Sequence, residues 1–216
     1  MKMKLGLKGK ACLIQAISAP VFVGLAWYVD CSAEELSPEA SAARKMLLFE
    51  GVGQAFLAIA AWMDPTRPNN KEFKDDFDGW VKHSQGTVVR ISCLWAMGCF
   101  FLMVTAGRLE LTSLALGGAY AGEIPYLCGI LGSLITASAL LGRVPLLPII
   151  LGCFVLGPVA AGAAQIQAGN TILGISQTLY IANFPLAMAR IITRWQGEIL
   201  NFIGWFVLAY AVTHKP

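Results

Sequence analysis

The sequence contains few charged side chains for its length. Charged residues make up 13% of its 216 positions, 56% are hydrophobic, and the mean hydropathy is +0.64, whereas a typical soluble domain has about 25% charged residues. A soluble domain would need more polar surface than 16 basic and 13 acidic side chains supply. The composition therefore excludes the soluble classes and predicts an integral membrane protein.

Other scarcities exclude whole classes of function. Net charge is only +3 and the basic residues are scattered, so we expect no nucleic-acid surface. Both histidines, His83 and His214, lie outside the apolar runs, and no two cysteines form a C-x-x-C pair. We therefore expect no metal site and no cofactor. Spans this poor in His, Asp and Glu also offer little of the acid, base and nucleophile that a membrane enzyme needs, which makes an enzyme the least favoured class.

Seven apolar runs are the dominant feature of the chain. They cover residues 11–29, 46–63, 91–107, 125–142, 144–164, 171–189 and 199–213. They do not alternate with period two, so they predict helices rather than barrel strands. About 20 helical residues cross a hydrocarbon core ~30 Å thick, and only the last run is clearly short. We predict an all-α fold, a polytopic transmembrane bundle of six to seven spans in a single domain over residues 1–216.

The basic residues divide unequally between the two sides of these spans. Only four lie on the side opposite the N-terminus: Arg44, Lys45, Arg108 and Lys215. The other 12 lie on the N-terminal side, which predicts an N-terminus on the cytoplasm-like side. The first run follows a basic stretch, as in a signal peptide, but no small-residue cleavage site closes it. We expect it to remain as the first crossing.

Two segments are expected not to cross. Residues 111–122 form a short apolar stretch with three glycines, which fits either an interfacial or re-entrant piece or an external loop packed on the bundle. Residues 64–90 are polar and contain a predicted amphipathic helix at about 70–83. Its apolar face carries Phe73, Phe77, Trp80 and Val81. That face suits either anchoring at the lipid headgroups or docking of a partner protein.

Glu50 is the only acidic residue inside an expected span. A carboxylate in hydrocarbon is costly unless it is paired, hydrated or protonated. Gln54 follows one turn later on the same helix face. Gln177 and Asn183 add polar groups to the sixth span before Pro185, which frees a backbone carbonyl there. These four residues are the candidate intramembrane site, with helix packing and headgroup contact as the alternatives.

Other features serve orientation or packing. Arg143, Arg190 and Arg194 lie at membrane boundaries, where they orient the chain or contact anionic lipid headgroups. Small residues recur at packing spacing in the fourth span, and as Gly157 and Ala161 in the fifth. Cys31 and Cys128 are both expected near the outer surface, where an oxidising environment would allow a disulfide.

Two functions remain. The sequence favours a non-enzymatic structural or accessory subunit of a membrane protein complex, because one carboxylate and a few amides are little machinery for a transporter. Its expected partners are membrane lipids and either other membrane subunits or further copies of this chain. The alternative is a small transporter or channel-like carrier with its polar site around Glu50.

Overall fold

The computed structural model describes residues 7–32, 35–63, 95–96, 99, 106–117, 155–179, 186, 191–192 and 194–214. Within these residues the chain forms six α-helices and no strands. They are α1 (Leu7–Cys31), α2 (Pro38–Met63), α5 (Ala106–Ala115), α8 (Gly157–Gln167), α9 (Thr171–Leu179) and α11 (Arg194–Thr213). The predicted all-α bundle is confirmed for this part of the chain.

α2 begins eight residues earlier than the apolar run had indicated, at residue 38 rather than 46. The cause is a local cap that hydropathy does not register. The backbone N–H of Ala40 donates to Oγ of Ser37 at 3.1 Å, and Pro38 occupies the first helical position. Glu39 lies in the first turn, where its charge is favourable at the helix N-terminus.

α1 and α2 pack as an antiparallel pair that depends on Gly51. A Cβ placed on Gly51 would lie 2.8 Å from the carbonyl oxygen of Ala19 and 2.9 Å from Cγ2 of Val23. Glycine therefore lets the two helix backbones approach more closely than any other residue would. Phe22 and Val29 of α1 are buried in the core that this approach creates.

α5 corrects an expected boundary. The sequence suggested a break between a span ending at residue 107 and a separate piece beginning at residue 111, whereas one continuous helix covers Ala106–Ala115. Leu111 is fully buried, and a Cβ on Gly107 would collide with Cγ of Met46 on α2. The helix continues across the boundary because its buried face packs against the rest of the bundle, which average hydropathy does not detect.

α8 and α9 form a tight hairpin. Gly169 adopts φ of +88° in the turn, and the backbone N–H of Asn170 donates to the carbonyl of Gln165 at 2.8 Å. The two helices approach closely at Gly162 of α8 and Gly174 of α9. A Cβ on Gly174 would lie 2.7 Å from the carbonyl oxygen of Gly162. α8 ends three residues later than residue 164, the end of the expected fifth run.

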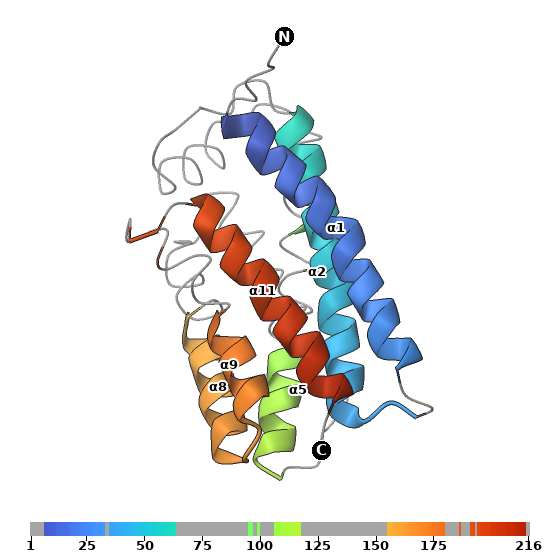
Figure 1. Ribbon diagram of the computed structural model, residues 1–216, viewed down its shortest axis with the longest axis vertical. Helices are drawn as coiled ribbons and strands as arrows, with labels where there is room; N and C mark the ends of the chain where they lie inside the picture. The colour runs from blue at the N-terminus through green and yellow to red at the C-terminus, as the bar shows by residue number, and fades with distance from the viewer. Residues whose placement is uncertain are drawn as a thin grey trace.

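α11 runs alongside α1 and joins the α1–α2 pair to the α8–α9 hairpin (Figure 1). The ring of Phe22 lies 5.3 Å from that of Phe202 and 6.0 Å from that of Trp205. On the α9 side, a Cβ on Gly204 would lie 3.2 Å from Cβ of Leu179. α11 is 20 residues long because it starts five residues before the expected run at residue 199.

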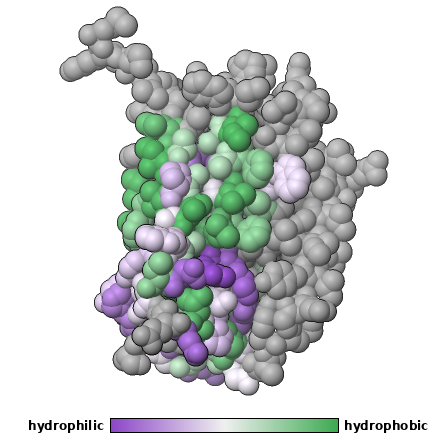
Figure 2. All heavy atoms as spheres, turned by 90° about the vertical axis from the view of Figure 1, so that its right-hand side faces the viewer, coloured by the Kyte–Doolittle hydropathy of each residue, from purple (hydrophilic) through white to green (hydrophobic). Residues whose placement is uncertain are grey.

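The outer surface of the described helices is largely apolar. Trp27 of α1 is 69% exposed, and Ile17, Ile203 and Tyr210 are also exposed. Figure 2 shows hydrophobic residues gathered over the upper part of the α1 and α2 face, with hydrophilic residues at the end where α1 leads into α2. One described helix, α1, is long and apolar enough to cross a membrane, over Leu13–Cys31; Ile199–Thr213 is a shorter apolar segment.

Several expected features fall outside the described residues. They are the run 125–142, the surface helix at about 70–83 and Cys128. The runs 91–107, 144–164 and 171–189 are described only in part. Cys31 is described and is an exposed, free cysteine.

We expect Gly51→Ala to lower the free energy of unfolding by about 1–3 kcal/mol, because the new methyl group meets backbone atoms that cannot move aside. Gly24→Ala is the matched control, since no described atom lies within 4 Å of a Cβ there. That variant should gain roughly 0.5–1 kcal/mol from the better helix former. Thermal unfolding in detergent measures both, and equal effects would contradict the close α1–α2 approach.

Candidate functional site

Ten polar or charged side chains are buried in the described bundle, and they form two groups. The first group belongs to α1, α2 and α11: Gln15, Ser18, Glu50, Gln54 and Asn201. The second belongs to α5, α8 and α9: Arg108, Glu110, Gln165, Ser176 and Gln177. Buried polar atoms are normally hydrogen-bonded, so the partners of each group show what it does.

Glu50 is the centre of the first group. It is the thirteenth of the 26 residues of α2, about 18 Å along the helix axis from Pro38. Its side chain is 1% exposed, and Nε2 of Gln54 donates to Oε1 of Glu50 at 3.0 Å. The structure thus brings together Glu50 and Gln54, as their one-turn spacing predicted. The carboxyl group is fully buried, not exposed at a helix end.

The first group also contains amide oxygens without hydrogen bonds. Oε1 of Gln15, Oε1 of Gln54 and Oδ1 of Asn201 are buried and have no hydrogen-bond partner among the described residues. They come from three different helices, α1, α2 and α11. A buried acceptor without a donor is unfavourable, so each of these three oxygens requires a partner beyond the described residues.

The second group is organised around Arg108, whose side chain is 4% exposed. Its Nε donates to Oε1 of Gln177 on α9 at 3.1 Å. The two residues border a small cavity with Ser176, Gly204 and Trp205, with room for about one water molecule. Gln177, which the sequence assigned to the same site as Glu50, therefore contacts Arg108 instead.

Gln165 ties α5 to α8 within this second group. Its side chain is completely buried, and its Nε2 donates to the carbonyl oxygen of Leu111 at 2.7 Å. Its Oε1 accepts from Nδ2 of Asn170 at 2.9 Å. Because both ends of this amide are bonded, Gln165 is a structural link and not a ligand-binding residue.

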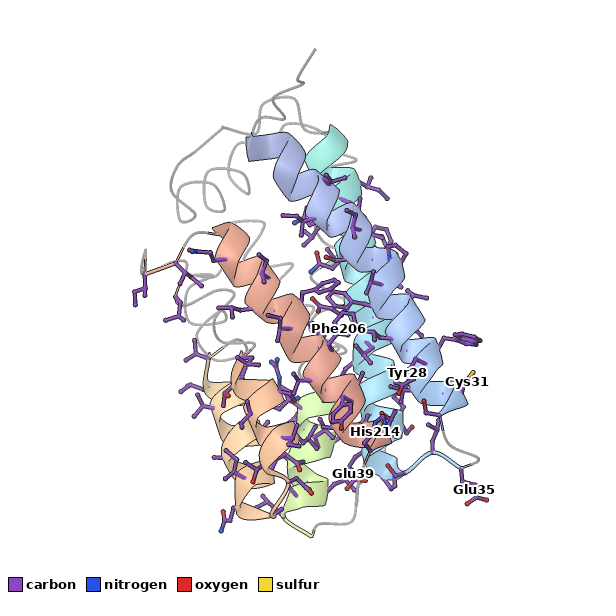
Figure 3. The ribbon with its side chains drawn as sticks, in the orientation of Figure 1. Tyr28, Cys31, Glu35, Glu39, Phe206 and His214 are labelled. Atoms are coloured by element: carbon purple, nitrogen blue, oxygen red, sulfur yellow. The ribbon has the colours of Figure 1, made fainter. Side chains whose placement is uncertain are left out.

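Two ion pairs lie near the end of the molecule where α1 ends and α2 begins. Nζ of Lys45 on α2 lies 3.5 Å from Oε1 of Glu110 on α5, and the Glu110 side chain is 7% exposed. Arg44 and Asp30 form a shorter contact of 2.6 Å, but both side chains are solvated, so this pair contributes little stability. Figure 3 shows Cys31, Glu35, Glu39 and His214 at this end too, where α1 and α11 end and α2 begins.

The environment of Glu110 changes its ionisation. Burial raises the pKa of the Glu110 carboxyl above its ordinary value of 4.5, and the ammonium of Lys45 opposes that rise. Since the folded state favours the protonated acid, Glu110 contributes its full stabilisation below pH 4.5 and loses it as the pH rises through the folded-state pKa. Glu110 lies beyond residue 107, where the third apolar run ends.

The remaining predicted site residues cannot be assigned contacts. Arg194 begins α11, but its side chain is outside the described set. The others lie outside the described residues altogether: Asn183, Arg143, Arg190, Phe73, Phe77, Trp80 and Val81. Among the residues that are described, no group of three or more His, Cys, Asp and Glu side chains converges.

Four residues of these two buried polar groups were not predicted as site residues from the sequence. They are Gln15, Asn201, Arg108 and Glu110. Gln15 and Asn201 are single amides inside apolar runs, and that isolation was the available signal. Arg108 was counted only as an orientation charge. Its partner Gln177 is 69 residues away in the chain, so no local spacing rule links them.

Comparison of the chain with protein-family models, curated proteins and solved structures finds no match.

We expect Lys45→Met to raise the pKa of Glu110 further, because it removes the nearby positive charge. Its thermal midpoint should fall relative to wild type at pH 7, with a much smaller difference at pH 4, where Glu110 is protonated in both proteins. Arg44→Met, which breaks only the exposed pair, is the control. A loss of the same size at both pH values would contradict the coupling of Lys45 to Glu110.

Proposed function

We propose that the protein is a multi-pass integral membrane protein. The support is the seven apolar runs together with an outer surface rich in exposed apolar side chains, such as Trp27 and Ile203. The apolar area on the α1 and α2 face borders a hydrophilic end (Figure 2), as expected where a lipid-facing surface meets a headgroup region. Ten polar or charged side chains are also buried inside the described bundle, and such residues in a membrane bundle normally face its interior.

Within that frame, we propose that it is a small carrier or channel-like protein that moves a small solute or a proton, with Glu50 and Gln54 as its polar centre. The observation that carries this function is a carboxyl group halfway along α2 that is 1% exposed and hydrogen-bonded to an amide. A carboxyl group in the interior of a membrane bundle is costly and is typical of ion and proton pathways.

The buried polar groups also change the balance between the two functions that the sequence left open. The subunit function was favoured because the sequence offered one carboxylate and a few amides. Gln15, Ser18 and Asn201 now add buried polar groups on helices that contact α2. A carrier therefore has more of the polar machinery that it needs than the apolar runs indicated.

We expect Glu50→Gln to abolish proton flux into proteoliposomes that contain the purified protein, while the thermal midpoint stays within a few degrees of wild type. Entrapped pyranine reports the flux under an imposed potassium diffusion potential. Glu35→Gln is the matched control because Glu35 is exposed between α1 and α2. Equal flux in wild type and Glu50→Gln would refute a proton-handling role for Glu50.

A structural or accessory subunit is the second candidate, and one described surface favours it. Ala16, Pro20 and Gly24 form an exposed stripe along α1 at intervals of four residues. No described atom lies within 4 Å of a Cβ on Gly24, so a helix of a partner or of a second copy has room to approach. By contrast, the small-residue stripe of α8, which includes Gly157 and Ala161, packs inside the bundle, since Ala161 is completely buried.

If α1 docks a partner helix, Gly24→Leu should convert a large, defined complex into the free 23.2 kDa chain. Native gels and mass spectrometry of mild-detergent extracts provide the measurement. Gly24→Ala should leave the complex intact because alanine is also a small residue that lets a partner helix approach closely. Migration as the same small species in wild type and both variants would remove the subunit function.

A further inference from the structure

Three amide oxygens in the bundle interior require a partner that the described chain does not supply. They are Oε1 of Gln15, Oε1 of Gln54 and Oδ1 of Asn201, and the three side chains are 3%, 4% and 1% exposed. Oxygens of this kind only accept hydrogen bonds or bind cations. Protein interiors rarely leave them without either.

Helix register places these residues at neighbouring levels of the bundle. Gly51 of α2 packs against Ala19 and Val23 of α1, and Gln54 lies three residues further along the antiparallel α2. Gln54 is therefore about 4.5 Å above that contact, at the level of Ser18 and one turn below Gln15.

α11 brings its residue to the same level. Phe22 of α1 packs against Phe202 and Trp205, and α11 runs in the same direction as α1 (Figure 1). Asn201 directly precedes Phe202, so it lies within about one turn of Gln54 along the bundle axis. All three side chains are buried, and each of the three helices contacts the other two. The oxygens thus belong to one region between α1, α2 and α11.

The chemistry of this region selects a class of ligand. Hard cations prefer carboxylate and carbonyl oxygens, and transporters hold sodium ions and protons with such groups between helices. Glu50 is the only buried acidic side chain that the structure describes on α1, α2 and α11. One carboxylate balances one positive charge, whereas a divalent cation would leave an excess charge in an apolar interior.

We propose that Gln15, Gln54 and Asn201, together with the Glu50 carboxylate, form a binding site for an alkali-metal cation between α1, α2 and α11. This inference rests on the proposed function, because it takes the bound cation to be the solute of the proposed carrier. The amide oxygens replace part of the hydration shell of the cation, as backbone carbonyls do in selectivity filters. The carboxylate supplies the compensating charge.

Thermal unfolding of the full chain in detergent tests the proposal. Sodium, potassium and N-methyl-D-glucamine chlorides are compared at constant ionic strength. Binding to the folded state predicts that sodium or potassium raises the midpoint saturably, by about 2–4 °C, relative to N-methyl-D-glucamine. Identical midpoints in the three salts would overturn the proposal and leave the oxygens bonded to water alone.

Variants locate the site. Gln54→Leu and Asn201→Leu each remove one oxygen. Both variants should lose the rise in midpoint that sodium or potassium produces, which we call the cation increment. Gln165→Leu is the matched control, because it removes a buried amide whose two ends are already bonded, and it should keep the increment. Asn201→Asp retains an oxygen and should also keep it, which covers the case in which Asn201→Leu fails to fold. Loss of the increment in Gln165→Leu or Asn201→Asp would contradict the assignment.

The outcome separates this inference from the proposed function. Proton flux that depends on Glu50 without a cation-specific midpoint shift would retain the carrier and overturn the cation site. A sodium- or potassium-dependent rise in midpoint that Asn201→Leu abolishes, combined with a proton flux that Glu50→Gln leaves unchanged, would retain the cation site and overturn the proton-handling role of Glu50.

Discussion

The burial of polar side chains inside an apolar bundle is the constraint on which the rest of this structure depends. Each buried amide, carboxylate or guanidinium must find a partner, because leaving one unbonded costs about 1–3 kcal/mol and more for a charged group. In the group around Arg108 and Gln165, the partners come from neighbouring helices of the same chain. In the group around Glu50, the described residues supply no donor to the amide oxygens of Gln15, Gln54 and Asn201. The group around Arg108 holds the fold together, and the group around Glu50 has capacity for a ligand.

Glycine makes that arrangement possible by controlling the distance between helices. Gly51 lets α1 and α2 approach closely enough to enclose Glu50, and Gly107 lets α5 contact α2 near the Lys45 and Glu110 pair. Larger residues at these positions would separate the helices and admit water or lipid to the polar groups. The small residues therefore act on the polar residues indirectly, by keeping them buried.

Much of the fold follows from the sequence, and the reasons for the rest are specific. Apolar runs predicted α1 and α11 to within a few residues, since a long apolar helix is encoded locally. The start of α2 was missed because Ser37 and Pro38 form a cap in a polar stretch. The pairing of Glu50 with Gln54 was predictable from one-turn spacing, whereas Arg108 with Gln177 was not, because tertiary packing alone brings α5 and α9 together.

In the proposed site, Glu50 is a carboxyl group that responds to a bound cation from inside the bundle. Infrared difference spectroscopy of the reconstituted protein tests this most directly, by exchanging N-methyl-D-glucamine for sodium or potassium over the same sample. We predict a shift in a carboxyl stretching band that is present in wild type and absent in Glu50→Gln. A difference spectrum that is flat in the carboxyl region, or identical in the two proteins, would contradict the account.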